Sequence, residues 1–269
     1  MFAKFRLPST TLTSYLNWLK STYRLDTDKW TYDVEKKRQE FYQDLLDTVW
    51  CDKKNGILDG RKLKEYVFPT GGEGDYDVFI SYSHDDEGLA LKLAYYLQEF
   101  CSLRVFLDCY IWNSADALLK AIDDDYCQTS DKKYYSYKSR NYSTSHVHAL
   151  LSMAILDVIN KTECCIVLDS NNSINLHLLE DPNQARTLSP WIFEEISFMR
   201  LLPQRSMRKT KYFSQGGALE SLNESKRLKI ANPADFFGFE ELTGDDLLYL
   251  NSDGEDSLDK LYERHLIRN

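Results

Sequence analysis

The segment Ser189–Glu195 holds the carboxylate best placed to do chemistry in this 269-residue chain. In Ser-Pro-Trp-Ile-Phe-Glu-Glu, Ser189 is a typical helix N-cap and Pro190 suits the first helical turn. Trp191 and Glu195 then share one helix face, with the carboxylate one turn beyond the indole. A fixed carboxylate of this kind can stabilise positive charge that develops on a bound substrate.

A second polar group follows a predicted buried strand. The run 78–80 (Val-Phe-Ile) is β-branched and aromatic, as is typical of a strand covered on both faces. Ser81, Tyr82 and Ser83 then fall at the carboxyl end of that strand, where ligands bind in open α/β sheets. The apolar spacing from residue 89 to residue 100 predicts a helix after this loop, for which Asp85 and Asp86 are plausible caps.

Two more strands are predicted to bring polar residues to the same edge. Residues 104–108 (Arg-Val-Phe-Leu-Asp) indicate a short strand ending in Asp108, followed by a loop with Trp112 and a helix from about 116 to 124. Residues 164–168 (Cys-Cys-Ile-Val-Leu) indicate a third buried strand, ending in Asp169. Parallel neighbours would place all these carboxyl ends at one crevice.

These motifs, in this order and spacing, resemble a TIR (Toll/interleukin-1 receptor) domain. The resemblance rests on the D-x-F-I-S-Y pattern of Asp77–Tyr82, the strand and loop of residues 104–115, and the Ser-x-Trp-x-x-x-Glu pattern of Ser189–Glu195. It covers roughly residues 75–202. The loop after Asp108 departs from the commonest family form, which carries Pro-Gly. Within the family, the chain looks most similar to prokaryotic antiphage proteins of the Thoeris type.

The resemblance implies an enzyme that cleaves the nicotinamide–ribose bond of NAD, its substrate, and makes an ADP-ribose-derived signal for a separate effector. It assigns the catalytic role to Glu195 and not to Glu194. Substrate contacts are then expected at Ser81, Tyr82, Ser83, Asp108, Trp112 and Trp191. The structural alternatives are that Trp191 packs to orient its helix, that Ser81 caps the next helix, and that Asp108 is solvated or pairs with Arg104.

The chemistry of this reaction fits a single carboxylate. The leaving group is a pyridinium that departs neutral and needs no general acid. Positive charge gathers on the ribose as an oxocarbenium ion, which one preorganised Glu can stabilise. This differs from the paired carboxylates of ordinary glycosidases. No metal and no further cofactor is expected; His146 and His148 are two apart on a predicted helix and point in different directions.

Two other functions share the predicted fold. A non-enzymatic TIR adaptor would signal by homotypic assembly and needs no carboxylate at position 195. A receiver-like phosphoacceptor domain would need an Asp at the end of its third strand, for which Asp169 is available, and a downstream Lys that is not convincingly placed.

The predicted architecture is a flavodoxin-like α/β fold with a central parallel sheet over residues 75–269, preceded by a helical extension over residues 1–74. Helices are expected at 12–23, 34–49, 147–158 and 256–265, and short strands at 66–68, 228–230 and 236–239. A linker is expected at 69–74. Residues 128–145 are expected to form a loop between two helices, and 171–188 a lid over the site.

The composition restricts the kinds of partner that the protein is expected to bind. A net charge of −9 disfavours nucleic acid and anionic membranes. The sequence lacks a run of about 20 apolar residues and a signal-peptide pattern, so a cytoplasmic protein without membrane association is expected. Six cysteines without C-x-x-C spacing indicate reduced thiols. A homo-oligomer is among the expected states.

Overall fold

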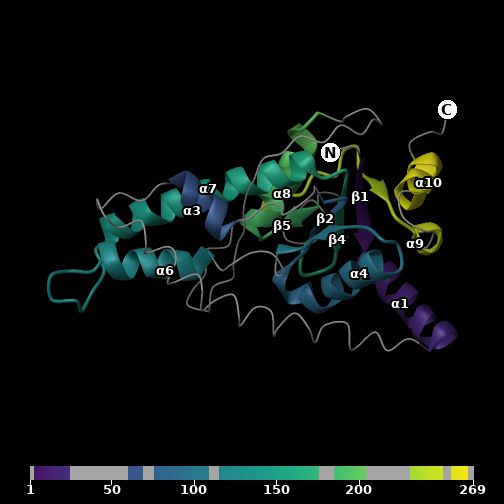
Figure 1. The fold of residues 1–269 in the computed structure, drawn as a ribbon, viewed down its shortest axis with the longest axis horizontal. Coiled ribbons are helices and arrows are strands. Elements are labelled where there is room, and N and C mark those ends of the chain that lie inside the picture. The colour runs from purple at the N-terminus through teal and green to yellow at the C-terminus, as the bar shows by residue number, and fades with distance from the viewer. Residues whose placement is uncertain are drawn as a thin grey trace.

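A five-stranded parallel sheet organises the computed structural model, with helices on both faces (Figure 1). The structure describes residues 3–24, 60–68, 76–108, 115–175, 185–203, 231–250 and 256–265. The strand order is β3-β2-β4-β1-β7. The strands are β1 (Ala3–Pro8), β2 (Val78–Ser81), β3 (Val105–Phe106), β4 (Cys164–Asp169) and β7 (Glu240–Glu241). The predicted α/β class with a central parallel sheet is confirmed, and the order is consistent with a flavodoxin-like fold.

The N-terminal segment is part of this sheet. A flavodoxin-like sheet has the order 2-1-3-4-5, with each number a strand in chain order. In this sheet β2, β3 and β4 stand in the positions of strands 1, 2 and 3 of that order. The position of strand 4 is occupied by β1, which comes from the start of the chain. β1 pairs with β4 over its whole length, from Ala3 beside Cys164 to Pro8 beside Asp169. The helix expected at 12–23 is present as α1 (Ser9–Tyr23). The helical extension expected over residues 1–74 did not include β1, which is a strand of the central sheet.

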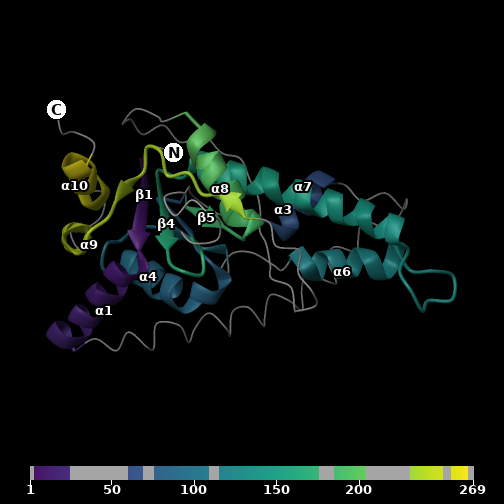
Figure 2. The same ribbon diagram turned by 180° about the vertical axis from the view of Figure 1, so that it is seen from behind.

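Helices from distant parts of the chain cover the two sheet faces. One face packs against α1, α4 (Glu87–Glu99), α9 (Gly244–Leu250) and α10 (Asp256–His265). The other packs against α3 (Gly60–Val67), α6 (Ala115–Tyr126), α7 (Tyr137–Lys161) and α8 (Pro190–Leu201). Figure 2 shows the molecule from behind, with the sheet between these layers.

Strand β4 shows why both faces need cover. Cys164, Ile166 and Leu168 enter one core, while Cys165 and Val167 enter the other. Alternating side chains point to opposite faces, and all five are apolar or behave so. This is the near-continuous apolar strand expected at the centre of a parallel sheet.

Several predicted elements differ from the structure. Residues 66–68 were predicted as a strand, but Val67 ends helix α3, whose buried Leu63 and Val67 are one turn apart. Residues 128–145 were predicted as a loop, but α7 already begins at Tyr137, capped by Ser136. Residues 236–239 form a turn, and the strands lie beside it as β6 (Asn232–Pro233) and β7.

Other predictions are confirmed or lie outside the described residues. The helix at 256–265 is α10, and strand 164–168 is β4. A short 3-10 turn, η3 (His84–Asp86), precedes α4. Asp86 occupies the N-cap position of α4 without a side-chain cap bond, so its predicted capping role is wrong. The helix at 34–49, the linker at 69–74 and the strand at 228–230 fall outside the described residues, as does 176–184 of the predicted lid.

Candidate functional site

Ser81 and Glu195 meet at the carboxyl end of β2. The Ser81 hydroxyl donates a hydrogen bond to Glu195 Oε2 at 2.6 Å. Ser81 is buried as the last residue of β2, and Glu195 is partly buried on α8. The two residues come from segments predicted independently, and the contact joins them at the edge where α/β sheets bind ligands.

Local sequence explains why α8 presents Glu195 to the sheet. The Ser189 side chain caps the helix by accepting a bond from the Ile192 N–H, and Pro190 occupies the first turn, as predicted. Ile192, Ile196 and Met199 form the buried stripe of α8. Glu195 lies within that stripe because it is three residues beyond Ile192 and one before Ile196. An apolar side chain would be the usual choice there.

The site strongly perturbs the Glu195 carboxyl group. Desolvation by burial raises the pKa of Glu195 from 4.5 to about 8, and the nearby charges of Asp108 and Glu194 act in the same direction. The Ser81 hydrogen bond opposes this shift. Burial disfavours the charged form, and a donor to the carboxylate favours it. Glu195 is therefore mostly protonated at neutral pH.

The neighbouring carboxylate Glu194 has different surroundings. It is partly buried, and burial raises its pKa, while a hydrogen bond with Ser152 lowers it. Ser152 belongs to α7, so Glu194 lies on the side of α8 that faces that helix. The two adjacent carboxylates thus have different partners, Ser81 for Glu195 and Ser152 for Glu194.

Tyr82 and Asp108 make a second polar contact beside the first. The Tyr82 hydroxyl donates a hydrogen bond to Asp108 Oδ1. Asp108 follows β3, which pairs with β2, so both residues extend from neighbouring strand ends. Because Asp108 raises the pKa of Glu195, its charge lies within reach of that carboxyl. The structure therefore brings Ser81, Tyr82, Asp108 and Glu195 together.

The remaining predicted site residues are not seen in contact with the Glu195 carboxyl. Ser83 is partly buried at the N-cap position of η3. Trp191 packs on the core beneath α8, with its ring 5.2 Å from that of His148 in an edge-to-face contact. This contact fits the packing role for Trp191. Trp112 lies outside the described residues.

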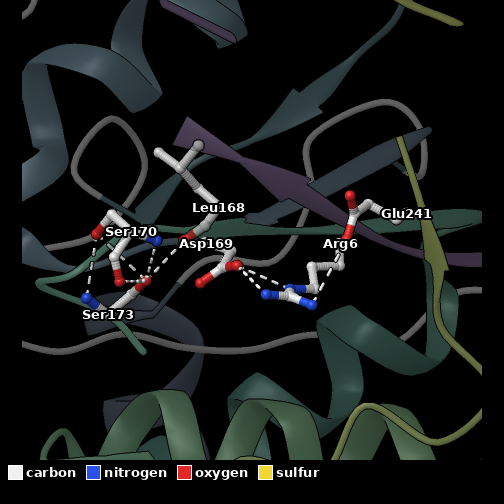
Figure 3. A network of polar contacts seen from close by, with 6 residues as sticks. All are labelled: Arg6, Leu168, Asp169, Ser170, Ser173 and Glu241. Carbon is white, nitrogen blue, oxygen red and sulfur yellow. Dashed lines mark hydrogen bonds and ion pairs between the residues drawn. The ribbon is translucent and has the colours of Figure 1, made fainter. Parts of the chain in front are cut away.

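An ion-pair network extends the polar edge toward β1 (Figure 3). Arg6 Nε donates to Asp169 Oδ2 at 2.7 Å, a terminal guanidinium nitrogen lies 2.5 Å from the same oxygen, and another lies 3.5 Å from Glu241. Burial raises the pKa of Asp169, and Arg6 acts against that rise. This network ties β1 to β4 and β7.

Strand register places this network on the same face as Glu195. Ser81 pairs with Val167, Val167 with Arg6, and Arg6 with Glu241, so these four residues form one row across the sheet. Adjacent strands are about 4.8 Å apart, which puts Arg6 roughly 10 Å from Ser81. The sequence analysis missed Arg6. The alternation of Lys4 and Arg6 with Phe5 and Leu7 was the available indication of a strand.

The loop after β4 is held to the loop after β2. Ser170 donates to Asp86, and the Asn172 amide donates to the other Asp86 oxygen at 2.8 Å. Ser173 donates to the Leu168 carbonyl at 2.8 Å and accepts from the Ser170 N–H at 2.9 Å (Figure 3). These bonds fix the start of the segment that was predicted to be a lid.

Comparisons with family models, curated proteins and solved structures returned no match. Among the described residues, no group of three or more His, Cys, Asp and Glu side chains is arranged to hold a metal ion. In the same part of the chain, no helix is both long enough and apolar enough to cross a membrane.

Proposed function

We propose that this protein is a TIR-type enzyme that cleaves the nicotinamide–ribose bond of NAD. The observation that carries the proposal is the Glu195 carboxyl, held by Ser81 at the carboxyl edge of a parallel sheet, with its pKa raised to about 8. Strongly perturbed carboxyls in such positions are more typical of functional sites than of surface helices.

The charges around Glu195 suit a cationic reaction centre. The nicotinamide ring of NAD is a pyridinium cation, and the transition state carries positive charge on the ribose. A cation beside Glu195 favours the ionised carboxylate, since opposite charges lower a carboxyl pKa. Asp108 adds negative potential from the next strand end. Proton loss from Glu195 and substrate binding are therefore coupled.

The surrounding residues have defined parts in this proposal. Ser81 orients the Glu195 carboxylate and stabilises its charge through the 2.6 Å hydrogen bond. Tyr82 holds Asp108 beside it. Such preorganisation is what makes a fixed charge effective, because the site does not have to rearrange as the transition state forms.

An adaptor function is the less favoured alternative. An adaptor that signals only by assembly gains nothing from a carboxyl in the buried stripe of α8, where burial opposes its ionisation. The product, proposed to be an ADP-ribose-derived signal for a separate effector in antiphage defence, follows from the resemblance of the motifs alone.

The test is direct incubation with NAD. Protein purified from uninfected cells, and protein recovered from phage-infected cells, would each be mixed with NAD. Released nicotinamide and the ADP-ribose-containing product would be identified by mass spectrometry. If the proposal is correct, at least one preparation should release one nicotinamide for each NAD consumed. Intact NAD in both preparations would exclude the enzyme and favour the adaptor.

A further inference from the structure

The gap between β2 and β4 is the topological switch point of the sheet. After β2 the chain adds β3 on one side and then returns to add β4 on the other. The helix that follows β2 is α4, on one face, and the helix that follows β4 is α8, on the other face. Because the two connecting loops diverge, α/β sheets bind ligands in the crevice between them.

Asp86 bridges this crevice from the loop after β2 to the loop after β4. Its Oδ1 accepts from the Asn172 side-chain amide at 2.8 Å, and its Oδ2 accepts from the Ser170 hydroxyl. Each oxygen of one carboxylate is thus occupied by a donor from the opposite loop. Asp86 and Ser170 are partly buried and Asn172 is exposed, so a ligand in the crevice reaches this contact from solvent.

The Asp86 carboxylate is turned away from its own helix. Asp86 stands at the N-cap position of α4 but makes no side-chain cap bond. An Asp at this position usually accepts from an N–H group of the first helical turn, which stabilises the helix. The orientation of this side chain is therefore explained by its contacts across the crevice and not by α4.

The turn after β4 fixes the Ser170 hydroxyl. Ser170 Oγ accepts from the Asn172 N–H at 3.0 Å and from the Ser173 N–H at 3.1 Å. Since both N–H groups approach the oxygen, the hydroxyl proton is left to point toward Asp86. Ser173, 1% exposed, anchors the same turn through the Leu168 carbonyl. Asp86 consequently meets a preorganised partner.

The two bonds to Asp86 have the form of a carboxylate holding a ribose. The neighbouring hydroxyls of a ribose present two O–H donors side by side, one for each carboxylate oxygen. A hydroxyl oxygen also accepts hydrogen bonds, so the Ser170 hydroxyl and the Asn172 amide keep partners when a diol lies between them and Asp86. In dinucleotide-binding α/β folds, an acidic side chain holds a ribose hydroxyl in this way.

The charges around Asp86 suit an unmodified ribose. Residues 84–87 are His-Asp-Asp-Glu, which carry −3 when the His is neutral. The His84 ring lies 3.5 Å from the Glu87 carboxylate. On the β4 side, Asp169 is paired with Arg6, and that pair adds no net charge. A phosphate on the 2′-oxygen of the ribose is repelled by these carboxylates, whereas a neutral diol is not.

The spacing from the Glu195 site fits a dinucleotide. Ser81 pairs with Val167, and Ser170 lies three residues beyond Val167. At 3.3 Å per residue, Ser170 is at most about 10 Å past the row of the sheet that contains Ser81. The two riboses of NAD, which the diphosphate joins, are separated by a distance of this order. One molecule of NAD can therefore reach both Glu195 and Asp86.

We propose that Asp86 holds the 2′- and 3′-hydroxyls of the adenosine ribose and so makes the site select NAD over its 2′-phosphorylated form. In the structure, Ser170 and Asn172 occupy the positions of the two sugar hydroxyls. When the ribose enters, it takes both carboxylate oxygens, and the loop after β4 holds the sugar from the other side. The inference rests on the proposed function, because Glu195 defines where the nicotinamide end of the ligand lies.

The test measures binding of ADP-ribose, which lacks nicotinamide and cannot undergo the proposed cleavage, by isothermal titration calorimetry on the full chain. Opening of the crevice costs the same for related ligands, so the ratio of two dissociation constants reports the ribose contact alone. The wild type should bind 2′-phospho-ADP-ribose about tenfold or more less tightly than ADP-ribose. Asp86→Ser keeps a side-chain acceptor for α4 and should reduce this ratio to about threefold or less.

A second ligand separates the hydrogen bond from the charge. ADP-ribose whose adenosine ribose lacks the 2′-hydroxyl should bind the wild type about tenfold less tightly than ADP-ribose, because a charged acceptor then loses its donor. Asp86→Ser should bind these two ligands equally, within about twofold. Asp86→Asn, which keeps the size of the side chain, should change both ratios in the same direction.

Asp85→Ser is the matched control. It removes the same charge from the adjacent residue, which is exposed, and should leave the ratio for the 2′-deoxy ligand at its wild-type value. Thermal unfolding confirms that each variant is folded.

Two results would overturn the proposal. The first is that the wild type fails to bind ADP-ribose up to about 1 mM. The second is that both ratios are the same in the wild type and in the two Asp86 variants, which would leave Asp86 as a link between loops only. NAD cleavage by the wild type together with either result refutes the role of Asp86 alone. Intact NAD together with ratios that depend on Asp86 refutes the enzyme and leaves the ribose site standing.

Discussion

Ser81 and Glu195 are 114 residues apart in sequence and joined by one hydrogen bond at the edge of the sheet. That bond is the direct physical link between the strand that opens the TIR-like pattern and the helix that closes it. It also opposes the desolvation that raises the pKa of Glu195, so the hydroxyl and the burial act against each other on one carboxyl. The predictions for Glu195 and for Ser81 depend on this balance.

Glu195→Gln should lower NAD cleavage by about 10²–10³-fold, the usual effect of removing one preorganised electrostatic contact. The fold should survive, because Gln resembles the protonated acid and keeps an acceptor for Ser81. Nicotinamide release and a thermal unfolding curve are the two measurements. Glu194→Gln is the matched control and should retain activity. The reverse pattern would assign the chemistry to Glu194.

The pH dependence should follow the ionisation of Glu195. In the proposed mechanism the carboxylate is the active form, and its pKa is about 8, so kcat/KM should rise about tenfold per pH unit below pH 8 and level off above it. Measuring kcat/KM from pH 6 to pH 9.5 checks this. A rate independent of pH in this window would contradict the role of Glu195.

The raised pKa of Glu195 also makes the free energy of unfolding depend on pH. Between pH 4.5 and about 8 the folded protein holds a proton on Glu195 that the unfolded chain releases. Wild-type stability should therefore fall as pH rises through this window, relative to Glu195→Gln, which lacks the group. Urea unfolding of both proteins at pH 5, 6.5 and 8 measures the difference, which should be smallest at pH 5 and should grow in favour of Glu195→Gln as the pH rises.

Ser81→Ala should move the activity profile to higher pH. The Ser81 hydroxyl lowers the pKa of Glu195, so removing it leaves desolvation and Asp108 unopposed. The midpoint of the acidic limb should then lie above 8. Ser197→Ala is the control, since the Ser197 hydroxyl bonds only along α8, to the Phe193 carbonyl at 2.7 Å. An unchanged midpoint in Ser81→Ala would show that the hydrogen bond does not tune Glu195.

The centre of the sheet was predictable from the sequence because its strands are apolar on both faces. β2 and β4 fall where the runs 78–80 and 164–168 indicated them. The start of α8 was equally clear, because Ser189 and Pro190 mark a helix N-terminus through local backbone chemistry. The rule that parallel strands share a carboxyl edge places Ser81 and Asp108 together, whereas the contact of Ser81 with Glu195 depends on how α8 packs on the sheet.

The position of β1 in the sheet could not be predicted from local sequence patterns. Its alternation of Ala3, Phe5 and Leu7 with Lys4 and Arg6 suits a strand, but the place of that strand in the sheet depends on pairing with β4, some 160 residues away. The ion pair of Arg6 with Asp169 follows only from that pairing. Residues 66–68 were mistaken for a strand because Val and Phe favour strands, whereas packing of Leu63 and Val67 on the core makes the segment helical.

Arg6→Met should destabilise the fold. The substitution removes the cation that pairs with Asp169, whose side chain is only 13% exposed, and leaves that carboxylate without its ion-pair partner. A cost of about 1–3 kcal/mol in the free energy of unfolding is expected, measured by urea denaturation at pH 7. Arg61→Met removes an exposed helix pair with Glu65 and should cost no more than about 0.5 kcal/mol. Equal costs would show that the network around β1 contributes no special stability.

Deleting residues 1–8 should prevent folding instead of releasing a regulatory segment. β1 pairs with β4 on one side and β7 on the other, so its loss exposes two strand edges and opens the sheet between them. It also removes Phe5 and Leu7, both fully buried. The truncated chain should be insoluble or lack a cooperative unfolding transition, as judged by expression yield and circular dichroism. Supplying the peptide of residues 1–8 in trans offers the complementary measurement, because a folded, soluble truncation that ignores the peptide would show that β1 is dispensable to the sheet.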